Sequence, residues 1–429
     1  MARRRRWTTW AHTHECHPRA WVTATSVPQV RAAVAMARRL GTEVRPAGAG
    51  RSGSALAMTE GVLLDTRGLD RVLAVDAEAG EVVAEPGITL RALSTRLAAA
   101  GLALETLGEC DHATLGGAVA TAMHASGAAF GSISSRVREL ELVLADGSLV
   151  VASPTQNPRL YAAARVGLGA FGVLTPIRLS CVPAFSVHVQ QREADLAEVL
   201  AAVEWLVAEH DHVELSWQPH AERAVVRTLD RLSADDSADA GAGALRRWRD
   251  RGGLALDASV SGPAGAPAAA LAGRLGRGTD RVADSAEAFV RPHPVRYRES
   301  EFAVPRVRLA DVLTDLRAGL RRAGARRGVL VRVRFGAPDD AWLAPTHARH
   351  SAYVAVRVPA AAEETGSLVA LAEAVAPVDG RPSWHGAHGL DAATLAPRYP
   401  RFADAVAVRD EVDPTRVFTN RLLARVLGA

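Results

Sequence analysis

Two stretches of small residues are the features of this sequence best suited to ligand chemistry. The first is Arg45-Pro46-Ala47-Gly48-Ala49-Gly50-Arg51-Ser52-Gly53-Ser54, and the second runs from Leu115 to Ser132. Residues without bulky side chains let backbone N–H groups approach a diphosphate and form concave sites for anions. Either stretch taken singly is as typical of a turn as of a ligand cradle. Two of them in one chain predict one large phosphate-containing cofactor.

The composition excludes several classes of enzyme and partner. The chain has 429 residues, 48% hydrophobic and 23% charged, which predicts a globular protein of two domains. All 51 of its basic residues are arginine, so a Schiff-base lysine, a pyridoxal-phosphate lysine and a P-loop lysine are excluded. The net charge is only +4, and the run Arg3 to Arg6 is more typical of a solvated tail than of a nucleic-acid contact. We therefore expect no nucleic-acid partner.

Membrane, disulfide and metal signals are weak. No apolar run approaches the roughly 20 residues that a membrane span needs. Three cysteines are too few and too scattered for a disulfide framework, which favours a cytoplasmic protein without membrane contact. The cluster His12, His14, Cys16 and His17 has metal-ligating residue types, but its order matches no standard zinc spacing. We predict no metal site, and the sequence gives no indication of oligomeric state.

The first 180 residues predict alternating helices and strands around the glycine-rich stretches. A capping box at Ser26 to Gln29 opens a predicted helix that ends at Gly41. Further elements are expected as strands at 61–65, 72–76 and 81–85, a helix on Leu90, Leu93 and Leu97, and a hairpin of 140–144 with 149–152. No G-x-G-x-x-G motif opens a helix directly after the first strand, so this α+β domain is not a Rossmann unit.

Cys181-Val182-Pro183 marks a predicted boundary between residues 1–183 and residues 184–429. The second part predicts helices at 196–207 and 309–323 and strands at 213–217, 329–335 and 351–358. The segment 233–288 has a loop-like composition, and we assign it no function.

Distinctive motifs occur along nearly the whole chain. They include Trp7-Thr8-Thr9-Trp10-Ala11, the first glycine-rich stretch, Thr114-Leu115-Gly116-Gly117, Gly169-Ala170-Phe171-Gly172-Val173, Glu299-Ser300-Glu301-Phe302, Asp339-Asp340-Ala341-Trp342 and Phe418-Thr419-Asn420. With these motifs the chain resembles the sugar-lactone and alditol oxidases of the vanillyl-alcohol-oxidase flavoprotein superfamily. Only about residues 233–290 lie outside the resemblance. It implies an α+β fold with a two-part FAD-binding domain of the vanillyl-alcohol-oxidase type. An α+β substrate (cap) domain follows, and its C-terminal segment returns to the flavin.

The resemblance also implies which residues bind FAD. They are Ala47, Gly48, Ala49, Gly50, Arg51 and Ser52 along the diphosphate, Gly108, Glu109, Thr114, Gly117, Thr121, His124, Gly127, Gly131 and Ser132 along the flavin and its linker, and Gly172 and Val173 at the adenine end. His124 has a structural rather than a catalytic role in this interpretation. Relatives usually attach FAD covalently through a histidine at the position of Arg51. Arginine cannot form that bond, so we predict non-covalent FAD with Arg51 near a phosphate oxygen.

The substrate side departs from the family pattern. The family's glutamate and arginine, two residues apart on one strand, align with Arg332 and Arg334, so the glutamate is lost. Two adjacent arginines favour an anionic small-molecule substrate. The alternative is that Arg332 points into solvent or pairs with Glu299 or Glu301.

The candidate catalytic residues include two histidines near the C-terminus. The family's His-Trp-Gly-Lys motif is replaced by Trp384-His385-Gly386-Ala387-His388, so the lysine is absent. Either histidine could replace it as a base or substrate donor, or the motif could be a surface turn. The candidate catalytic residues are therefore Arg334, Arg332, His385, His388 and Glu299.

The position that faces flavin C4a in the family is Gly108 here, and a small residue there is associated with oxidases. We therefore expect an FAD-dependent oxidase that takes a hydride from a CH–OH group at flavin N5, uses dioxygen as acceptor and has diverged toward specialised metabolism. The alternatives are a flavin dehydrogenase, an oxidase of C–C or C–N bonds, and a degenerate flavin fold used only for binding.

Overall fold

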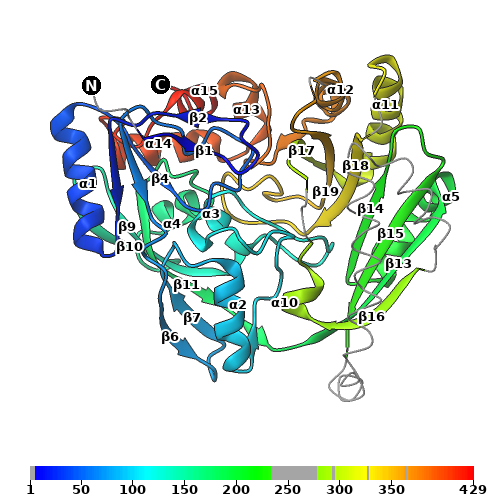
Figure 1. Ribbon diagram of the computed structural model, residues 1–429, viewed down its shortest axis with the longest axis horizontal. Coiled ribbons are helices and arrows are strands. Elements are labelled where there is room, and N and C mark those ends of the chain that lie inside the picture. Colours follow the sequence, from blue (N-terminus) through cyan, green and yellow to red (C-terminus); the bar gives the residue numbers. More distant parts are fainter. Residues whose placement is uncertain (1–4, 233–277, 292–294, 326–327, 363–364) are drawn as a thin grey trace.

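The computed structural model describes residues 5–232, 278–291, 295–325, 328–362 and 365–429. Most of the segment to which we assigned no function, residues 233–277, lies outside these ranges. The described residues form two α+β parts, as predicted (Figure 1).

The first part contains two main sheets. A five-stranded sheet has the order β10-β9-β11-β7-β6, and a parallel sheet has the order β3-β5-β4. Their strands are β3 (Ala20–Thr23), β4 (Val44–Ala47), β5 (Val62–Asp65), β6 (Val72–Asp76), β7 (Glu81–Ala84), β9 (Val137–Val143), β10 (Leu149–Ala152) and β11 (Val173–Ser180). Short strand pairs are β1 (Trp7–Thr8) with β2 (Glu15–Cys16) and β8 (Leu102–Ala103) with β12 (Val182–Pro183). The helices are α1 (Val27–Leu40), α2 (Leu90–Ala99), α3 (Leu115–Ala120), α4 (Pro158–Ala164) and the 3-10 turn η1 (Ile133–Arg136).

Helix α1 confirms its predicted apolar face but not its predicted cap. Its buried residues are Val30, Ala33, Val34 and Ala37, and Gly41 ends it in the left-handed conformation at φ 58°. The capping-box prediction is wrong, because the Ser26 side chain makes no cap hydrogen bond. The backbone N–H and the hydroxyl of Thr25 instead donate to the Gln29 side-chain oxygen.

The second part is built on an eight-stranded sheet with the order β16-β13-β15-β14-β18-β19-β17-β20. Its strands are β13 (Ser186–Asp195), β14 (His212–Trp217), β15 (Arg223–Arg231), β16 (Thr279–Asp284), β17 (Tyr297–Pro305), β18 (Leu330–Gly336), β19 (Ser351–Pro359) and β20 (Arg381–Pro382). Its helices are α5 (Leu196–Ala201), α6 (Val203–Glu209), α10 (Ser285–Ala288), α11 (Leu309–Arg322) and α12 (Gly366–Val375), with 3-10 turns η3 (Arg306–Arg308) and η4 (Ala376–Val378). The single helix predicted at 196–207 is two helices, α5 and α6, separated at Ala202.

The alternation of residues along these strands gives the eight-stranded sheet two different faces. Val331, Val333 and Phe335 of β18 join the apolar cluster formed with helices α5, α6, α11 and α12. Successive side chains of a strand point to opposite faces, so Arg332 and Arg334 point away from these helices. On β17 and β19 the charged side chains of Glu299, Glu301 and Arg357 likewise lie on the face opposite to the cluster residues. The sheet therefore buries one apolar and one charged face.

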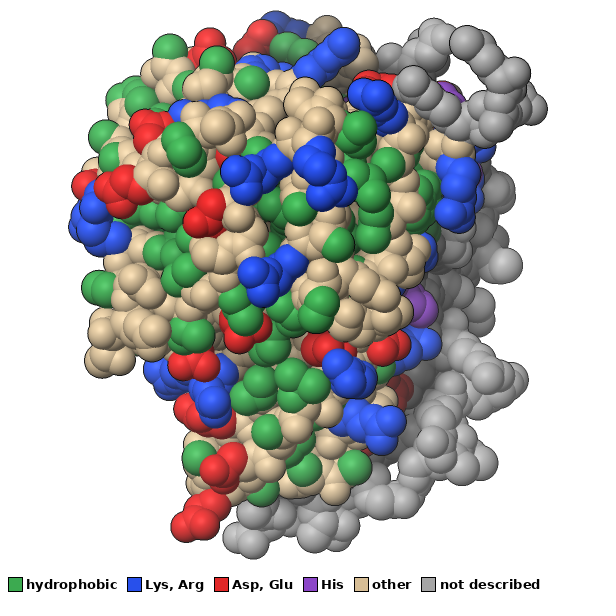
Figure 2. Space-filling model, turned by 90° about the vertical axis from the view of Figure 1, so that its left-hand side faces the viewer, with side chains coloured by type: hydrophobic (Ala, Val, Ile, Leu, Met, Phe, Trp, Pro, Cys, Tyr) green, Lys and Arg blue, Asp and Glu red, His purple; other side chains and the backbone are tan. Residues whose placement is uncertain are grey.

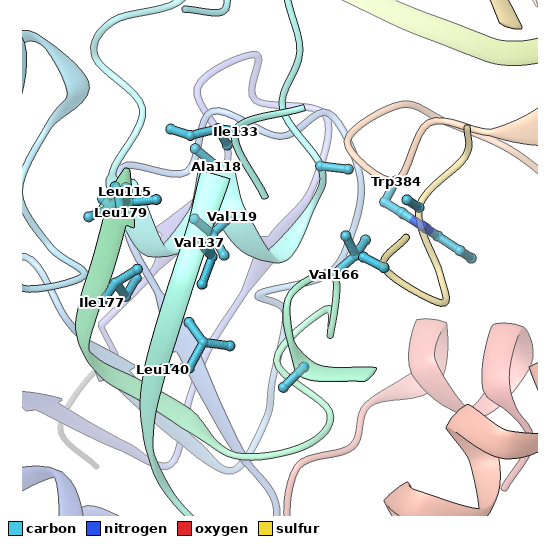
Figure 3. Packing of buried hydrophobic residues seen from close by; sticks show 14 of the residues in the cluster. Leu115, Ala118, Val119, Ile133, Val137, Leu140, Val166, Ile177, Leu179 and Trp384 are labelled. Carbon is cyan, nitrogen blue, oxygen red and sulfur yellow. The ribbon is translucent and has the colours of Figure 1, made fainter. Parts of the chain in front are cut away.

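The C-terminal segment packs on the first part of the chain. It consists of α13 (Ala392–Leu395), η5 (Ala396–Arg398), α14 (Phe402–Val412) and α15 (Arg421–Leu427), and α14 contacts α4 of the first part (Figure 1). Trp384 belongs to the same hydrophobic cluster as Leu115 and Val119 of α3 (Figure 3). The Asn420 amide donates to the carbonyls of Ala55, Leu56 and Met58. Each sheet lies on one side of residue 183, and one isolated bridge, between Gly127 and Gly336 of β18, crosses it; we retain that position as the predicted domain boundary.

The surface shows mixed charge where it can be seen. Figure 2 presents the side of the molecule on which α1 lies, and arginine and acidic side chains are interspersed over it. Within the described ranges, no helix combines the length and the apolar character needed to cross a bilayer.

Arg45 joins the glycine-rich loop to the C-terminal segment. Its guanidinium is fully buried and donates to the carbonyls of Leu56, Leu168, Gly169 and Phe418. Burial lowers its pKa to about 9, so it stays charged at neutral pH.

Replacing Arg45 with methionine should therefore destabilise the protein by about 3 kcal/mol, because several buried carbonyls lose a charged donor. Chemical denaturation of the two proteins measures this difference. The exposed Arg39 of α1 provides the control, since Arg39→Met should change the free energy of unfolding by less than about 0.5 kcal/mol. Equal stability of Arg45→Met and Arg39→Met would contradict the assigned role.

Candidate active site

A cavity lies between the glycine-rich loops and the charged face of the large sheet. It encloses about 1370 Å³, counting its open mouth. The loop after β4, the segment leading into α3 and the turn between α4 and β11 line the cavity on one side. Side chains of the second part, Tyr297, Arg334 and His385, complete the lining. The glycines and other small residues of the three segments on the first side let backbone atoms form part of the wall, beside side chains such as Leu56 and Leu168.

Most of the residues predicted to bind FAD line this cavity. They are Gly48, Ala49, Gly50, Arg51, Ser52, Gly108, Glu109, Thr114, Gly117, Thr121, His124, Gly172 and Val173. Four others do not line it, namely Ala47, Gly127, Gly131 and Ser132. Two of these four connect the parts of the chain instead. The Gly127 N–H donates to the Phe335 carbonyl of β18, and the Ser132 hydroxyl donates to Asp339.

Several lining residues were not singled out by the sequence, among them Thr66, Pro86, Leu168 and Tyr297. Gly169 belongs to a motif that matched the family, and its neighbour Leu168 could have been found from that signal. The others come from strand ends and turns whose residue types carry no ligand signal.

The packing of the first loop shows why glycine is needed in it. A Cβ added to Gly48 would overlap the Thr114 hydroxyl and lie 3.1 Å from the Thr114 Cβ, so the loop backbone lies directly against the start of α3. Gly50 has φ 65°, the left-handed conformation that glycine adopts without strain. A large cavity whose wall includes glycine backbone fits a dinucleotide, because backbone donors suit a diphosphate. FAD bound there supplies a hydride acceptor.

Arg51, which the sequence resemblance aligned with the family's covalent histidine, packs on an aromatic ring. Its guanidinium carbon lies 4.9 Å from the ring centroid of Trp10. Arg51 and Cys110 line both this cavity and a second one of about 1720 Å³ between α2 and α10. Burial raises the pKa of the Cys110 thiol, so that thiol is protonated at neutral pH.

The opposite wall is formed by charged side chains of the sheet. Arg334 of β18 lines the cavity, and its Nη2 lies 2.5 Å from Oε1 of Glu301 on β17. Glu301 also accepts from His124 at 3.2 Å, and the His124 ring stacks on Tyr353 at 3.5 Å between centroids. These contacts join strands β17, β18 and β19 of the sheet to the loop after α3 that contains His124.

A second series of ion pairs runs beside the first. Glu109, from the loop after Gly108, contacts both Arg332 of β18 and Arg357 of β19. Arg357 also contacts Glu299 of β17, which lies directly opposite it in the ladder. The imidazole Nε2 of His385 lies 3.3 Å from Glu299 and 3.8 Å from Glu301. The ion pairs are continuous from Arg332 to His385.

Burial and pairing shift the pKa values of these groups in opposite directions. Burial by itself would raise the pKa of Glu299 and Glu301, but the arginines and His385 outweigh it and lower both. Burial opposes charge on His385, yet the two glutamates raise its pKa, so the imidazolium is favoured. Burial lowers the pKa of His124, against the opposing effect of Glu301. The pKa of Arg334 is raised because Glu301 outweighs burial.

The five candidate catalytic residues separate into two groups. Arg334 and His385 line the cavity, whereas Arg332, Glu299 and His388 do not. Arg332 is buried, and it pairs with Glu109 and, at 3.8 Å, with Glu214. It therefore points neither into solvent nor to Glu299 or Glu301, so both versions of that alternative are wrong. The sequence resemblance placed Glu109 only along the flavin and did not indicate it as the partner of Arg332.

His388 belongs to a different environment from His385. Its ring packs on Trp384, and burial lowers its pKa to about 4. The structure therefore gives these two histidines different surroundings and pKa shifts in opposite directions.

One group of residues within the described part of the chain has metal-ligand geometry. Ligand atoms of Glu299, Glu301 and His385 all lie within 4.8 Å of one another. Both carboxylates already contact arginines, so the protein supplies their positive partners itself.

Comparisons with known proteins agree with this architecture. Residues 177–426 match the family model described as D-arabinono-1,4-lactone oxidase, and residues 18–153 match one described as FAD binding domain. The chain is 36% identical to the L-gulono-1,4-lactone dehydrogenase of Mycobacterium tuberculosis, over 98% of this chain and 99% of that protein. It is 30% identical to the L-gulonolactone oxidase of Bos taurus over 97% of each chain. It is also 32% identical to the alditol oxidase of a Streptomyces species over 86% of each.

A solved structure shows the same fold at low identity. A solvent-stable cholesterol oxidase superimposes with a TM-score of 0.79 over 99% of this chain and 98% of that one, at 19% identity. The confirmed two-part fold, the glycine-walled cavity and the end-to-end sequence matches have one explanation. The chain belongs to the D-arabinono-1,4-lactone oxidase family of FAD-dependent enzymes.

Proposed function

We propose that this protein oxidises a CH–OH group of a small polar substrate in the cavity between the glycine-rich loops and the sheet. The observation that carries the proposal is that a permanently charged arginine, Arg334, lines a cavity whose other wall is suited to a dinucleotide. The relatives are named for lactones and alditols, which are both polyhydroxy compounds. The overall reaction is alcohol plus dioxygen to carbonyl compound plus hydrogen peroxide.

Arg334 is the residue we assign to the reacting oxygen. When a hydride leaves the carbon, negative charge develops on the oxygen, and a fixed cation nearby stabilises it. Arg334 is held by Glu301 and needs no movement to reach that state. His385 is the second donor on this wall, since the two glutamates favour its charged form. We do not assign catalysis to Arg332, Glu299 or His388. Arg332 and Glu299 take part in the buried ion pairs, and His388 packs on Trp384.

We further propose that FAD is bound without a covalent bond. Arg51 lies where relatives have the linking histidine, and its guanidinium is stacked on Trp10. Precipitating the purified yellow protein with acid should therefore release all of the flavin into the supernatant, where its absorbance is measured. Flavin that stays in the protein pellet would contradict this prediction and would direct attention to another attachment residue.

The electron acceptor is dioxygen in an oxidase and another compound in a dehydrogenase, and there are arguments for each. Gly108 favours an oxidase by its family association with oxygen access. However, a Cβ at Gly108 would lie 2.6 Å from Met123 Cγ, so side-chain packing also explains this glycine. A 36%-identical relative is named as a dehydrogenase. A dehydrogenase is therefore the second candidate function.

One experiment tests the reaction and separates these candidates. The FAD-loaded protein is given a panel of alditols, sugar lactones and sugar acids, and peroxide release is compared with the reduction of an artificial dye. We expect peroxide at a rate that accounts for all substrate oxidised. Dye reduction without peroxide would support the dehydrogenase. A protein that neither binds flavin nor reacts with any compound would support a binding role instead.

A further inference from the structure

We infer that the second cavity, between α2 and α10, is the route by which a polyhydroxy substrate reaches the FAD cavity. The inference rests on the proposed function in taking the substrate to react beside Arg334. Its evidence is the contact between the two cavities, the change in exposure from one to the other, and the mixed polar and apolar lining of the second.

The two cavities adjoin each other. Arg51 and Cys110 line both of them. The ring of Trp10, which lines the second cavity, packs edge-on against that of Tyr297, which lines the FAD cavity, with 5.6 Å between the ring centroids. Rings in direct contact leave no room for a further layer of protein between them. The two cavities are therefore separated there by single side chains.

Exposure falls from the second cavity to the FAD cavity. Thr95 and Ala98 of α2 line the second cavity and are exposed. Arg51 and Cys110, where the two cavities meet, are half-buried. The side chain of Arg334, in the FAD cavity, is only 5% exposed. The reacting end of the FAD cavity thus lies deep, and the second cavity leads toward it from the exposed surface of α2.

Arg51 is held loosely at the point where the cavities meet. Its guanidinium stacks on Trp10, and it makes no hydrogen bond or ion pair with any residue that the structure describes. A cation–π contact that is open to water contributes only about 0.5–1 kcal/mol. Turning this side chain aside to let a molecule pass therefore costs little.

The walls of the second cavity combine polar and apolar groups, as a sugar does. They include the hydroxyls of Ser94 and Thr95, the ion pair of Arg91 with Asp111, and the apolar side chain of Leu107. The polar groups can exchange hydrogen bonds with sugar hydroxyls, and the apolar ones can contact the C–H faces of a sugar. An apolar substrate would take water from the polar groups without replacing its hydrogen bonds. The lining favours a sugar lactone or an alditol as the molecule that passes.

The test closes the second cavity from either side. Ala98 of α2 and Ala286 of α10 line it and do not line the FAD cavity. The two plug variants, Ala98→Trp and Ala286→Trp, are loaded with FAD and mixed anaerobically with L-gulono-1,4-lactone over a range of concentrations. We expect the second-order rate of flavin reduction at low lactone to fall about 10-fold or more, because entry that must first open a path is slow. The limiting rate at high lactone should stay the same.

Ala99→Trp is the matched control, since Ala99 is the exposed neighbour of Ala98 on α2 and does not line the second cavity. It should react like the original protein. Unchanged second-order rates in both plug variants would overturn the inference. A limiting rate that falls by the same factor as the second-order rate would also overturn it, because the tryptophan would then disturb the reacting end and not the route.

A second measurement does not depend on turnover. A compact methanethiosulfonate reagent is added to the FAD-loaded proteins, and mass spectrometry of the peptides distinguishes modification of Cys110 from that of Cys16 and Cys181. Cys110 should react in the original protein and in Ala99→Trp, and about 10-fold more slowly in the plug variants. Equal rates at Cys110 in all four proteins, or no reaction of Cys110 in any of them, would contradict the route.

Failure of this inference can be told apart from failure of the proposed function. Lactone oxidation that is equally fast in the plug variants would refute the route alone. Protection of Cys110 by the plugs, in a protein that oxidises no compound of the panel, would refute the proposed function alone.

Discussion

Replacing Arg334 with methionine should leave FAD bound and slow the reduction of the flavin by substrate about 1000-fold, the effect of removing a fixed donor from developing negative charge. Among the described residues of the eight-stranded sheet, Arg334 is the only arginine that lines the cavity. The rate of flavin bleaching after anaerobic mixing measures the effect. The spectrum of the unmixed protein shows whether FAD is still present.

Two further variants separate this role from a structural one. Glu301 would lose its arginine in Arg334→Met, so Arg334→Lys is included because it keeps the positive charge. The lysine variant should fold like the unmodified protein and react at an intermediate rate, because an ammonium cannot reproduce the planar guanidinium. Arg223→Met, at an exposed position of β15, should react normally. A methionine variant that binds FAD and reacts within about 10-fold of the unmodified rate would place Arg334 outside the reaction.

Changing Gly48 to alanine should weaken FAD binding about 100-fold, because overpacking at such a contact costs about 1–3 kcal/mol or more. The added Cβ would overlap the Thr114 hydroxyl and push the first loop away from α3. Titration of the apoprotein with FAD, followed by quenching of flavin fluorescence, measures the dissociation constant.

The chain offers a matched control for this glycine. Gly389 has no atom within 4 Å of an added Cβ and no positive φ, so Gly389→Ala should bind FAD normally. Thr114→Ala in the background of Gly48→Ala removes the overlapping hydroxyl and should recover part of the affinity. Unchanged affinity in Gly48→Ala would show that the loop can move away from α3 without loss and that its tight packing does not form the cradle.

The parts of this site that sequence could predict are those written in local patterns. Small residues identify the backbone cradle because their lack of side chains is visible one residue at a time. The alternation around Arg332 and Arg334 predicts that both point to one face of a strand, and the structure confirms that they point away from the helix-covered face. What could not be predicted is which acid neutralises each arginine. Glu109 and Arg332 are separated by 223 positions, and only the folded sheet brings them together.

Two local predictions failed although the residue types fit them. The residue types at Ser26 and Gln29 suit a capping box, but Gln29 accepts from Thr25 instead, and both arrangements satisfy donors at the start of the helix. Residues 196–207 have a helical pattern throughout, and nothing in their side chains marks the break at Ala202.

A crystal structure of the FAD-loaded protein tests most directly the claim on which the account depends, that the cavity holds the dinucleotide with its ring beside the charged face. We predict the diphosphate along Gly48 to Ser52 and the isoalloxazine next to Arg334 and His385. FAD bound in the second cavity between α2 and α10, or a ring turned away from Arg334, would contradict the account.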